Sequence, residues 1–198
     1  MPFFSAIFLS AVSAFALSRF IDFLYSRPNS PLTFPEKKIN LLIRFSCLFL
    51  LLFCTFFYFQ NLYKTIFIIF LLIITITDFE QYVIFDIVIL PFALSGIVII
   101  IVFDLPLVER LLTALFAGSF FLALLVLTKN GIGGGDVKLV ATLGLWLGAD
   151  KLISTILTAS ILGGVCALVL ILCGIKRRTD FFAYGPYFCI AAAFHFLH

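Results

Sequence analysis

Charged residues are scarce in this chain of 198 residues, where Asp, Glu, Lys and Arg together make up 12% of the sequence. A soluble domain carries roughly 25% charged residues and fewer than half apolar ones, whereas 64% of the residues here are apolar. These figures exclude a soluble globular domain, a disordered chain and a nucleic-acid-binding domain. The apolar surface must therefore face lipid, and we expect the bilayer, but no nucleic acid, as a partner.

Cysteine pairs with the spacing of metal or redox sites are absent as well. The five cysteines lie in apolar runs and form no CxxC pair, and free cysteine usually packs as a small hydrophobic residue. We therefore expect no metal site and no cofactor. Serine, cysteine and histidine also lack the motifs that are typical of a catalytic nucleophile.

Long apolar runs are abundant instead. About 20 apolar residues cross a bilayer core as a helix, and charges and glycines divide this chain into eight segments. The expected fold class is an all-α polytopic membrane protein with about eight transmembrane helices. The third and sixth segments are short enough to be half-helices beside a polar cavity, and a Gly-rich loop precedes the sixth. The segments are 3–24, 41–59, 65–77, 83–103, 108–128, 137–147, 152–173 and 181–197.

Lys and Arg are distributed unequally between alternate loops. Cytoplasmic loops carry the excess of these residues, and the two sides of this topology hold ten and three. The richer side is predicted to be cytoplasmic, which places both termini outside. The ten are Arg19, Arg27, Lys37, Lys38, Arg44, Lys129, Lys138, Lys176, Arg177 and Arg178; the three are Lys64, Arg110 and Lys151.

Two aspartates stand at the cytoplasmic edges of apolar segments. Asp78 follows the run IFIIFLLIITIT, and Asp136 follows a cluster of four glycines within five positions. An ionisable residue at such an edge is costly to desolvate and is a functional candidate. A plainer interpretation makes Asp78 a charge at a helix end, in which case Glu80 and Asp86 are equal candidates. Asp136, in turn, could be a helix N-cap.

The glycine cluster favours a functional interpretation, because a helix cap needs no such cluster. Glycines at this density allow positive φ angles and close approach of the backbone, whereas Gly144 and Gly148, four residues apart, are typical of close helix packing. Two carboxylates in a partly desolvated site share a proton. One can then activate water while the other protonates a carbonyl oxygen, which is amide hydrolysis without a covalent intermediate.

Three stretches of the chain also carry a resemblance to a known family. Residues 131–139, GIGGGDVKL, with residues 141–148, ATLGLWLG, look like its second aspartate motif. Residues 77–86, TDFEQYVIFD, are similar to its first motif, although Phe85 stands where the family usually has Pro. Residues 182–187, FAYGPY, are similar to a segment of its last span. The chain thus resembles the type IV prepilin leader peptidases, which are GxGD membrane aspartyl proteases.

This resemblance implies a function and a set of site residues. The chain would be an aspartyl endopeptidase that cleaves the leader of type IV pilin or pseudopilin precursors at the cytoplasmic face of the bacterial plasma membrane. Residues 1–64 would form a membrane hairpin with a short cytoplasmic link, and residues 65–198 the peptidase core. The implied catalytic pair is Asp78 and Asp136, the active-site loop contains Gly133, Gly134, Gly135 and Lys138, and the possible contacts of a basic leader are Glu80 and Asp86.

Other functions remain open at this stage. The chain could be a related GxGD peptidase that processes another membrane signal sequence. A small membrane transporter would also place acids beside a broken helix, although near the midplane of the bilayer rather than at one face. Longer members of the family also N-methylate the trimmed pilin. The link at 26–40 is too short to fold into a methyl-donor pocket, so we expect cleavage without methyl transfer.

Overall fold

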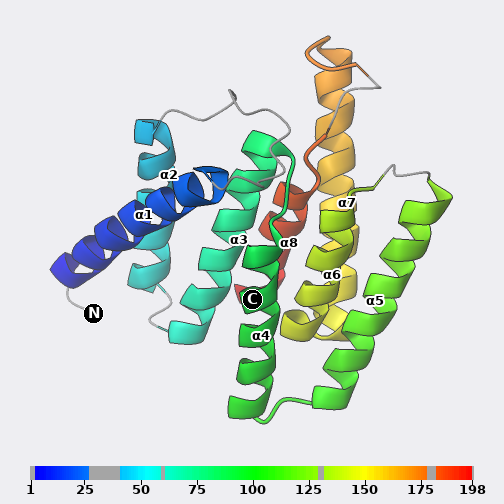
Figure 1. Cartoon of the computed structure of the whole chain (residues 1–198), viewed down its shortest axis with the longest axis horizontal. Helices are drawn as coiled ribbons and strands as arrows, with labels where there is room; N and C mark the ends of the chain where they lie inside the picture. Colours follow the sequence, from blue (N-terminus) through cyan, green and yellow to red (C-terminus); the bar gives the residue numbers. More distant parts are fainter. Residues whose placement is uncertain (1–2, 27–40, 59–60, 129–131, 178–181, 198) are drawn as a thin grey trace. The chain divides into compact units, whose positions relative to one another are not determined.

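The computed structural model describes residues 3–26, 41–58, 61–128, 132–177 and 182–197 (Figure 1). Most of the predicted cytoplasmic link at 26–40 lies outside these ranges. Within them, the chain forms α-helices joined by short connections. The helices are α1 (Phe3–Ser26), α2 (Leu41–Tyr58), α3 (Leu62–Gln81), α4 (Asp86–Val102), α5 (Leu107–Leu127), α6 (Gly134–Leu147), α7 (Ala149–Leu172) and α8 (Gly185–Leu197).

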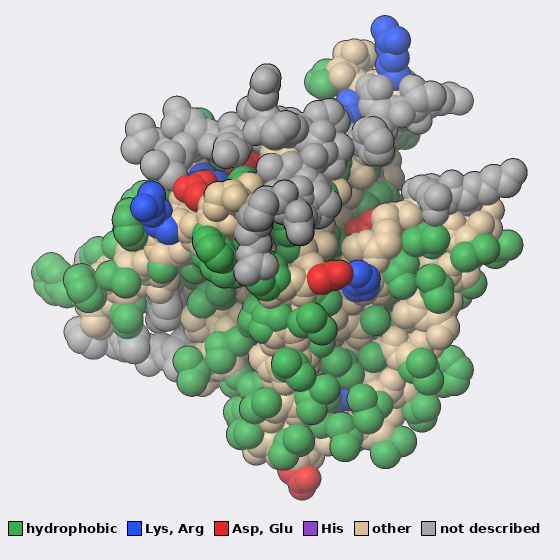
Figure 2. Space-filling model, in the orientation of Figure 1, with side chains coloured by type: hydrophobic (Ala, Val, Ile, Leu, Met, Phe, Trp, Pro, Cys, Tyr) green, Lys and Arg blue, Asp and Glu red, His purple; other side chains and the backbone are tan. Residues whose placement is uncertain are grey.

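The described helices have the length and surface of membrane spans. Four of them, α1, α3, α5 and α7, are long and apolar enough to cross a bilayer. Their large side chains are widely exposed, for example Phe116 at 69% and Leu172 at 76%. On the face drawn in Figure 2, hydrophobic side chains cover much of the described surface, and charged ones occur in small groups. Because such a surface is stable only in lipid, the chain is an all-α polytopic membrane protein, as predicted.

One of the two helices predicted to be short has a different length. The third segment, expected at 65–77, is the 20-residue helix α3. The prediction ended it at its flanking charges, but Lys64, Asp78 and Glu80 all continue the helix. The sixth segment is short, as predicted, with 14 residues in α6. The other short helix is α8, which has 13 residues.

Contacts divide the chain into two compact units, Met1–Val83 and Ile84–His198. In the first unit α1 packs against α2, and both contact α3. The predicted boundary between residues 64 and 65 would separate α3 from these two partners. The division into a hairpin and a peptidase core stays a prediction.

In the second unit α6 is the central helix, because it contacts α4, α5, α7 and α8. Its side chains from Leu139 to Leu147 are almost all buried, whereas α5 and α7 expose most of theirs. The packing on α5 depends on Gly144, where an added Cβ would lie 2.9 Å from the Cα of Ala114. The predicted packing role of Gly144 is therefore confirmed.

The C-terminal end of α6 is fixed by polar residues from the first turn of α5. Arg110 donates to the carbonyls of Leu145 and Trp146, at 2.9 and 2.5 Å, and the last carbonyls of a helix have no partner within the helix itself. Glu109 accepts the N–H of Ala149 at 2.9 Å. Between these contacts Gly148 takes a φ of +75°. Gly148 is therefore required for the turn between α6 and α7, and an added Cβ there would also lie 3.2 Å from Oε1 of Glu109 in α5.

Candidate active site

Asp136 lies in the first turn of α6. The cap of this helix is Gly133, with φ −70° and ψ 140°, so the alternative that Asp136 is the cap is wrong. The Asp136 carboxylate turns back and accepts a hydrogen bond from the backbone of Gly133, as the third residue of a helix often does. Its Oδ1 atom is buried and has no hydrogen-bond partner among the described residues. Gly131, the first glycine of the cluster, lies outside those residues.

The described glycines that precede Asp136, which are Gly133, Gly134 and Gly135, do not take positive φ angles, contrary to the prediction. Among the described glycines, positive φ occurs at Gly148 and Gly174. Gly133 is extended, and Gly134 and Gly135 already belong to α6. Positive φ therefore does not explain this part of the cluster.

Close approach explains two of these glycines. A Cβ on Gly135 would lie 2.9 Å from the Cβ of Ile84, and a Cβ on Gly133 would lie 3.1 Å from Oδ2 of Asp136. In contrast, a Cβ on Gly134 would meet only a leucine methyl group at 4.0 Å. The turn before Asp136 thus packs directly against the residues that precede α4 and leaves little room beside the carboxylate itself.

Burial changes the acidity of Asp136. It raises the pKa of this carboxyl from 3.8 to about 6, and the hydrogen bond from Gly133 only partly opposes the shift. Burial also raises the pKa of Tyr184, which the negative charge of Asp136 raises further. The phenol of Tyr184 therefore lies within electrostatic reach of the Asp136 carboxylate. Residue-based reasoning missed Tyr184; its place in the FAYGPY stretch was the available signal.

Lys138 and Asp86 join the first turns of α6 and α4. The Nζ atom of Lys138 donates to Oδ1 of Asp86 at 2.6 Å, and both side chains are more than half exposed. Just before Asp86, Phe85 has φ −76° and ψ 131°, which proline also adopts. The backbone at Phe85 therefore has a conformation that a proline at this position could also adopt.

Asp78 lies in the first unit, in the last turn of α3, where it is buried with 6% of its surface exposed. The helix ends at Tyr82, which has a left-handed φ of 57° and whose N–H donates to the carbonyl of Asp78. A non-glycine residue in this conformation is uncommon. The last helical residue is therefore Gln81, three residues after the aspartate.

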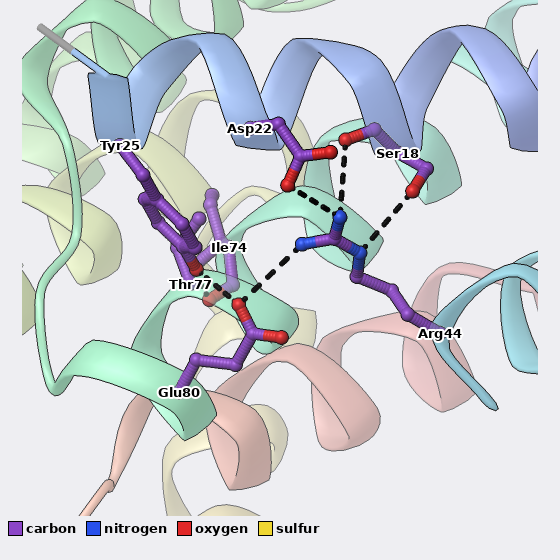
Figure 3. Close-up of polar contacts among 7 residues, drawn as sticks. All are labelled: Ser18, Asp22, Tyr25, Arg44, Ile74, Thr77 and Glu80. Carbon is purple, nitrogen blue, oxygen red and sulfur yellow. Dashed lines mark hydrogen bonds and ion pairs between the residues drawn. The ribbon is translucent and has the colours of Figure 1, made fainter. Parts of the chain in front are cut away.

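Glu80 is buried in the same turn, with 1% of its surface exposed. Figure 3 shows the Tyr25 hydroxyl donating to Oε2 of Glu80 at 2.5 Å, and Nη1 of Arg44 lies 3.7 Å from that oxygen. Glu80 thus contacts side chains from two other helices of its own unit. Its predicted contact with a substrate leader stays a prediction, whereas Asp86, the other residue of that prediction, has an exposed side chain.

In the described part of the chain, no three His, Cys, Asp or Glu side chains are placed together as potential metal ligands. The cysteines within it are all free thiols.

Comparisons with known proteins point in one direction. A sequence model described as "Type IV leader peptidase family" matches residues 65–168, which is slightly more than half of the chain. A prepilin leader peptidase/N-methyltransferase from Aeromonas salmonicida (strain A449) is 39% identical over 74 residues, which cover 37% of this chain and 25% of that protein. A protein of the same name from Pseudomonas aeruginosa is 38% identical over 72 residues, 36% of this chain and 25% of its own length.

A third relative of that name, from Neisseria gonorrhoeae, is 41% identical over 58 residues, which cover 29% of this chain and 19% of the relative. The chain thus matches a quarter or less of the length of these three relatives. No solved structure matches the chain.

Proposed function

The protein belongs to the type IV leader peptidase family, and from this membership we propose that it is an aspartic endopeptidase that removes the leader of a type IV pilin or pseudopilin precursor. The relatives named above are prepilin leader peptidase/N-methyltransferases. Because the matches cover a quarter or less of their length, their activity is carried to this chain as part of the proposal.

The observation that carries the proposal is the state of the Asp136 carboxylate. One side of it is held by the backbone of Gly133, while Oδ1 is buried without a hydrogen-bond partner in the described chain. Leaving a buried carboxylate oxygen unpaired is costly, and the cost is understandable where a substrate or water molecule supplies the missing partner. The raised pKa, about 6, lies in the range where a carboxyl group both takes up and releases protons.

Asp78 is the proposed second carboxylate. In the reaction, one aspartate takes a proton from the attacking water while the other gives its proton to the oxygen of the scissile carbonyl. The C–N bond of the tetrahedral intermediate then breaks as the first aspartate gives the proton it took from water to the leaving amine. A hydroxyl of the intermediate returns its proton to the second aspartate as the carboxyl product forms, so the pair again holds one proton. Two carboxylates and water are sufficient for this hydrolysis, so the proposal requires no metal or cofactor.

The proposed substrate has a short basic leader followed by an apolar helix. Such a chain places its cleavage site at the membrane surface, and the excess of Lys and Arg in alternate loops favours the cytoplasmic face of the plasma membrane as the location of the site. Asp86 is the better of the two predicted leader contacts, because its exposed carboxylate is paired with Lys138 and a leader lysine can take the place of that partner. Glu80 is buried.

Cleavage of a defined precursor tests the proposal. The purified full chain is incubated in lipid vesicles with a pilin precursor, and the product is weighed by intact mass spectrometry. We expect a cut at the end of the leader, abolished by Asp136→Asn and preserved by the control Ser154→Ala, whose hydroxyl bonds only to its own helix. Undiminished cleavage by Asp136→Asn would reject the aspartic mechanism. Adding S-adenosylmethionine also tests the expectation that the product is not methylated.

A further inference from the structure

A buried polar network joins all three helices of the first unit (Figure 3). From α1 come Ser18, Asp22 and Tyr25, which are spaced by four and three residues and therefore share one helix face. Arg44 comes from the first turns of α2, and Glu80 from the last turn of α3. The network thus ties the turn that contains Asp78 to the two preceding helices. Arg44 and Tyr25 both lie before residue 65, where the match to the family begins.

Arg44 is the centre of the network. Its Nη2 donates to Oδ1 of Asp22 at 2.6 Å, and its Nε donates to the Ser18 hydroxyl at 3.2 Å. Its Nη1 forms an ion pair with Glu80 at 3.7 Å and has no hydrogen bond among the described residues. The side chains of Arg44 and Glu80 are 3% and 0% exposed. A charge buried to this degree requires a partner, so each of the two holds the other in place.

Tyr25 further restricts the position of the Glu80 carboxylate. Its hydroxyl donates to Oε2 of Glu80, the same oxygen that faces Arg44. The Tyr25 side chain is 5% exposed, so its ring is held by packing while its hydroxyl meets the acid. Glu80 is therefore held from two directions, by α1 and by α2.

Holding Glu80 also determines where Asp78 faces. Residues that are two positions apart along an α-helix point about 200° apart around its axis. Asp78 is therefore directed nearly opposite to Glu80. If the last turn of α3 rotated, both side chains would move together. This turn is the last one of α3, which ends before its cap residue Tyr82, and the ends of helices fray most easily.

We propose that Glu80 is a positioning residue, clamped by Arg44 and Tyr25, which fixes the rotation of the last turn of α3 and thereby the direction of the Asp78 carboxylate. This inference rests on the proposed function, in which Asp78 is catalytic. It gives α1 and α2 a role in catalysis and assigns Glu80 to the enzyme's own architecture, not to the binding of a leader.

Steady-state kinetics of two conservative variants test the proposal. Tyr25→Phe removes one hydroxyl and keeps the ring, and Glu80→Gln keeps the shape and the acceptor but removes the charge. For both, we expect kcat per folded molecule to fall about tenfold or more, since small displacements of a catalytic group have such effects, with KM changed less than twofold. Ser10→Ala is the matched control, because this buried α1 hydroxyl donates to the carbonyl of Ile7 in its own helix. Wild-type kcat in both test variants would overturn the proposal.

A series of precursors separates positioning from leader binding. In the wild type and in Glu80→Gln, KM should rise by the same factor when the leader lysines are replaced by glutamine. If Glu80→Gln lost this discrimination, Glu80 would be a leader contact and the proposal would be wrong. Arg44→Lys should retain more activity than Arg44→Met, because it keeps the charge beside Glu80; equal losses would contradict the role of the ion pair.

Chemical labelling provides a readout that does not depend on cleavage. A hydrophobic carbodiimide modifies membrane carboxyl groups, and mass spectrometry quantifies the label at Asp78. Tyr25→Phe should change the labelling rate of Asp78 several-fold, whereas Ser10→Ala should not; equal rates in all three proteins would refute the clamp. Asp78→Asn and Asp136→Asn are assayed alongside. If they cleave normally, the proposed function fails, whereas if they are inactive and Tyr25→Phe has both wild-type kcat and wild-type labelling, only the clamp fails.

Discussion

Gly135→Ala is the substitution that most sharply tests the turn before Asp136. An added Cβ would lie 2.9 Å from the Cβ of Ile84 and 3.3 Å from its Cγ1. Ordinary van der Waals contacts begin at 3.4 Å. The backbone at Gly135 and the backbone at Ile84 must therefore move apart by at least about 0.5 Å, which is the difference between 3.4 and 2.9 Å. Because the contact involves a Cβ atom, rotation of the Ile84 side chain cannot relieve it. The displacement therefore reaches the backbone that carries Asp136.

Two effects of this substitution on stability oppose each other. Overpacking costs roughly 1–3 kcal/mol, whereas alanine is favoured over glycine in a helix by about 1 kcal/mol. We therefore expect a net loss of about 0–2 kcal/mol in the free energy of unfolding. Turnover should be more sensitive, because a misplacement of about 1 Å can cost about 100-fold. A shift of half that size predicts a loss of about tenfold.

The assay compares kcat for a pilin precursor in Gly135→Ala, in Gly134→Ala and in the double variant Gly135→Ala/Ile84→Gly. Gly134→Ala is the matched control for the steric contact, because its Cβ would meet only one atom, at 4.0 Å, and it should lose less turnover than Gly135→Ala. The double variant removes the Cβ of Ile84 and should recover part of the loss. Equal turnover in the two single variants, or no recovery in the double variant, would refute the reasoning from close approach.

Three further predictions follow from the second unit. Gly144→Ala should lower the thermal unfolding temperature by more than Gly135→Ala does, because its Cβ would meet the backbone of Ala114; a smaller decrease would contradict the close contact. Asp136→Asn should unfold at a higher temperature than the wild type at pH 8 but not at pH 4. Folding raises the pKa of Asp136 from 3.8 to about 6, so the free energy of unfolding of the wild type falls by up to about 3 kcal/mol as the pH rises through that range. An equal difference in unfolding temperature at both pH values would contradict this shift. Lys138→Met and Asp86→Asn should show a coupling below about 1 kcal/mol in a double-mutant cycle, as exposed ion pairs do; a larger value would show that the pair is shielded from water.

The number of helices and their membrane character could be predicted from the sequence, because both follow from apolar runs of sufficient length. The ends of α3 could not. A charge normally ends a span, but Glu80 continues the helix because Arg44 and Tyr25, which are distant in sequence, satisfy its carboxylate. A span-by-span reading contains no information about such partners.

The stretches that resemble the family's aspartate motifs could be identified from the sequence, but only part of the physical reason for their glycines could be. Positive φ and close approach of the backbone were both expected, and in the described part of the cluster the structure shows close approach, to Ile84 and to the Asp136 carboxylate, without positive φ. Positive φ occurs at Gly148, where packing was expected. Both differences between prediction and structure have one cause. A glycine in the sequence indicates that a side chain is excluded, but only the residues that lie nearby in the fold show what excludes it.

The most direct test of the central claim is a double-mutant cycle on Asp78 and Asp136. Cleavage rates of a pilin precursor are measured for Asp78→Asn, Asp136→Asn and the double variant, all in folded protein. If the two carboxylates share one proton in one reaction, either substitution alone removes the mechanism, and the double variant should be no more than a few-fold slower than each single variant. Losses that multiply, or either single variant cleaving at the wild-type rate, would contradict the account.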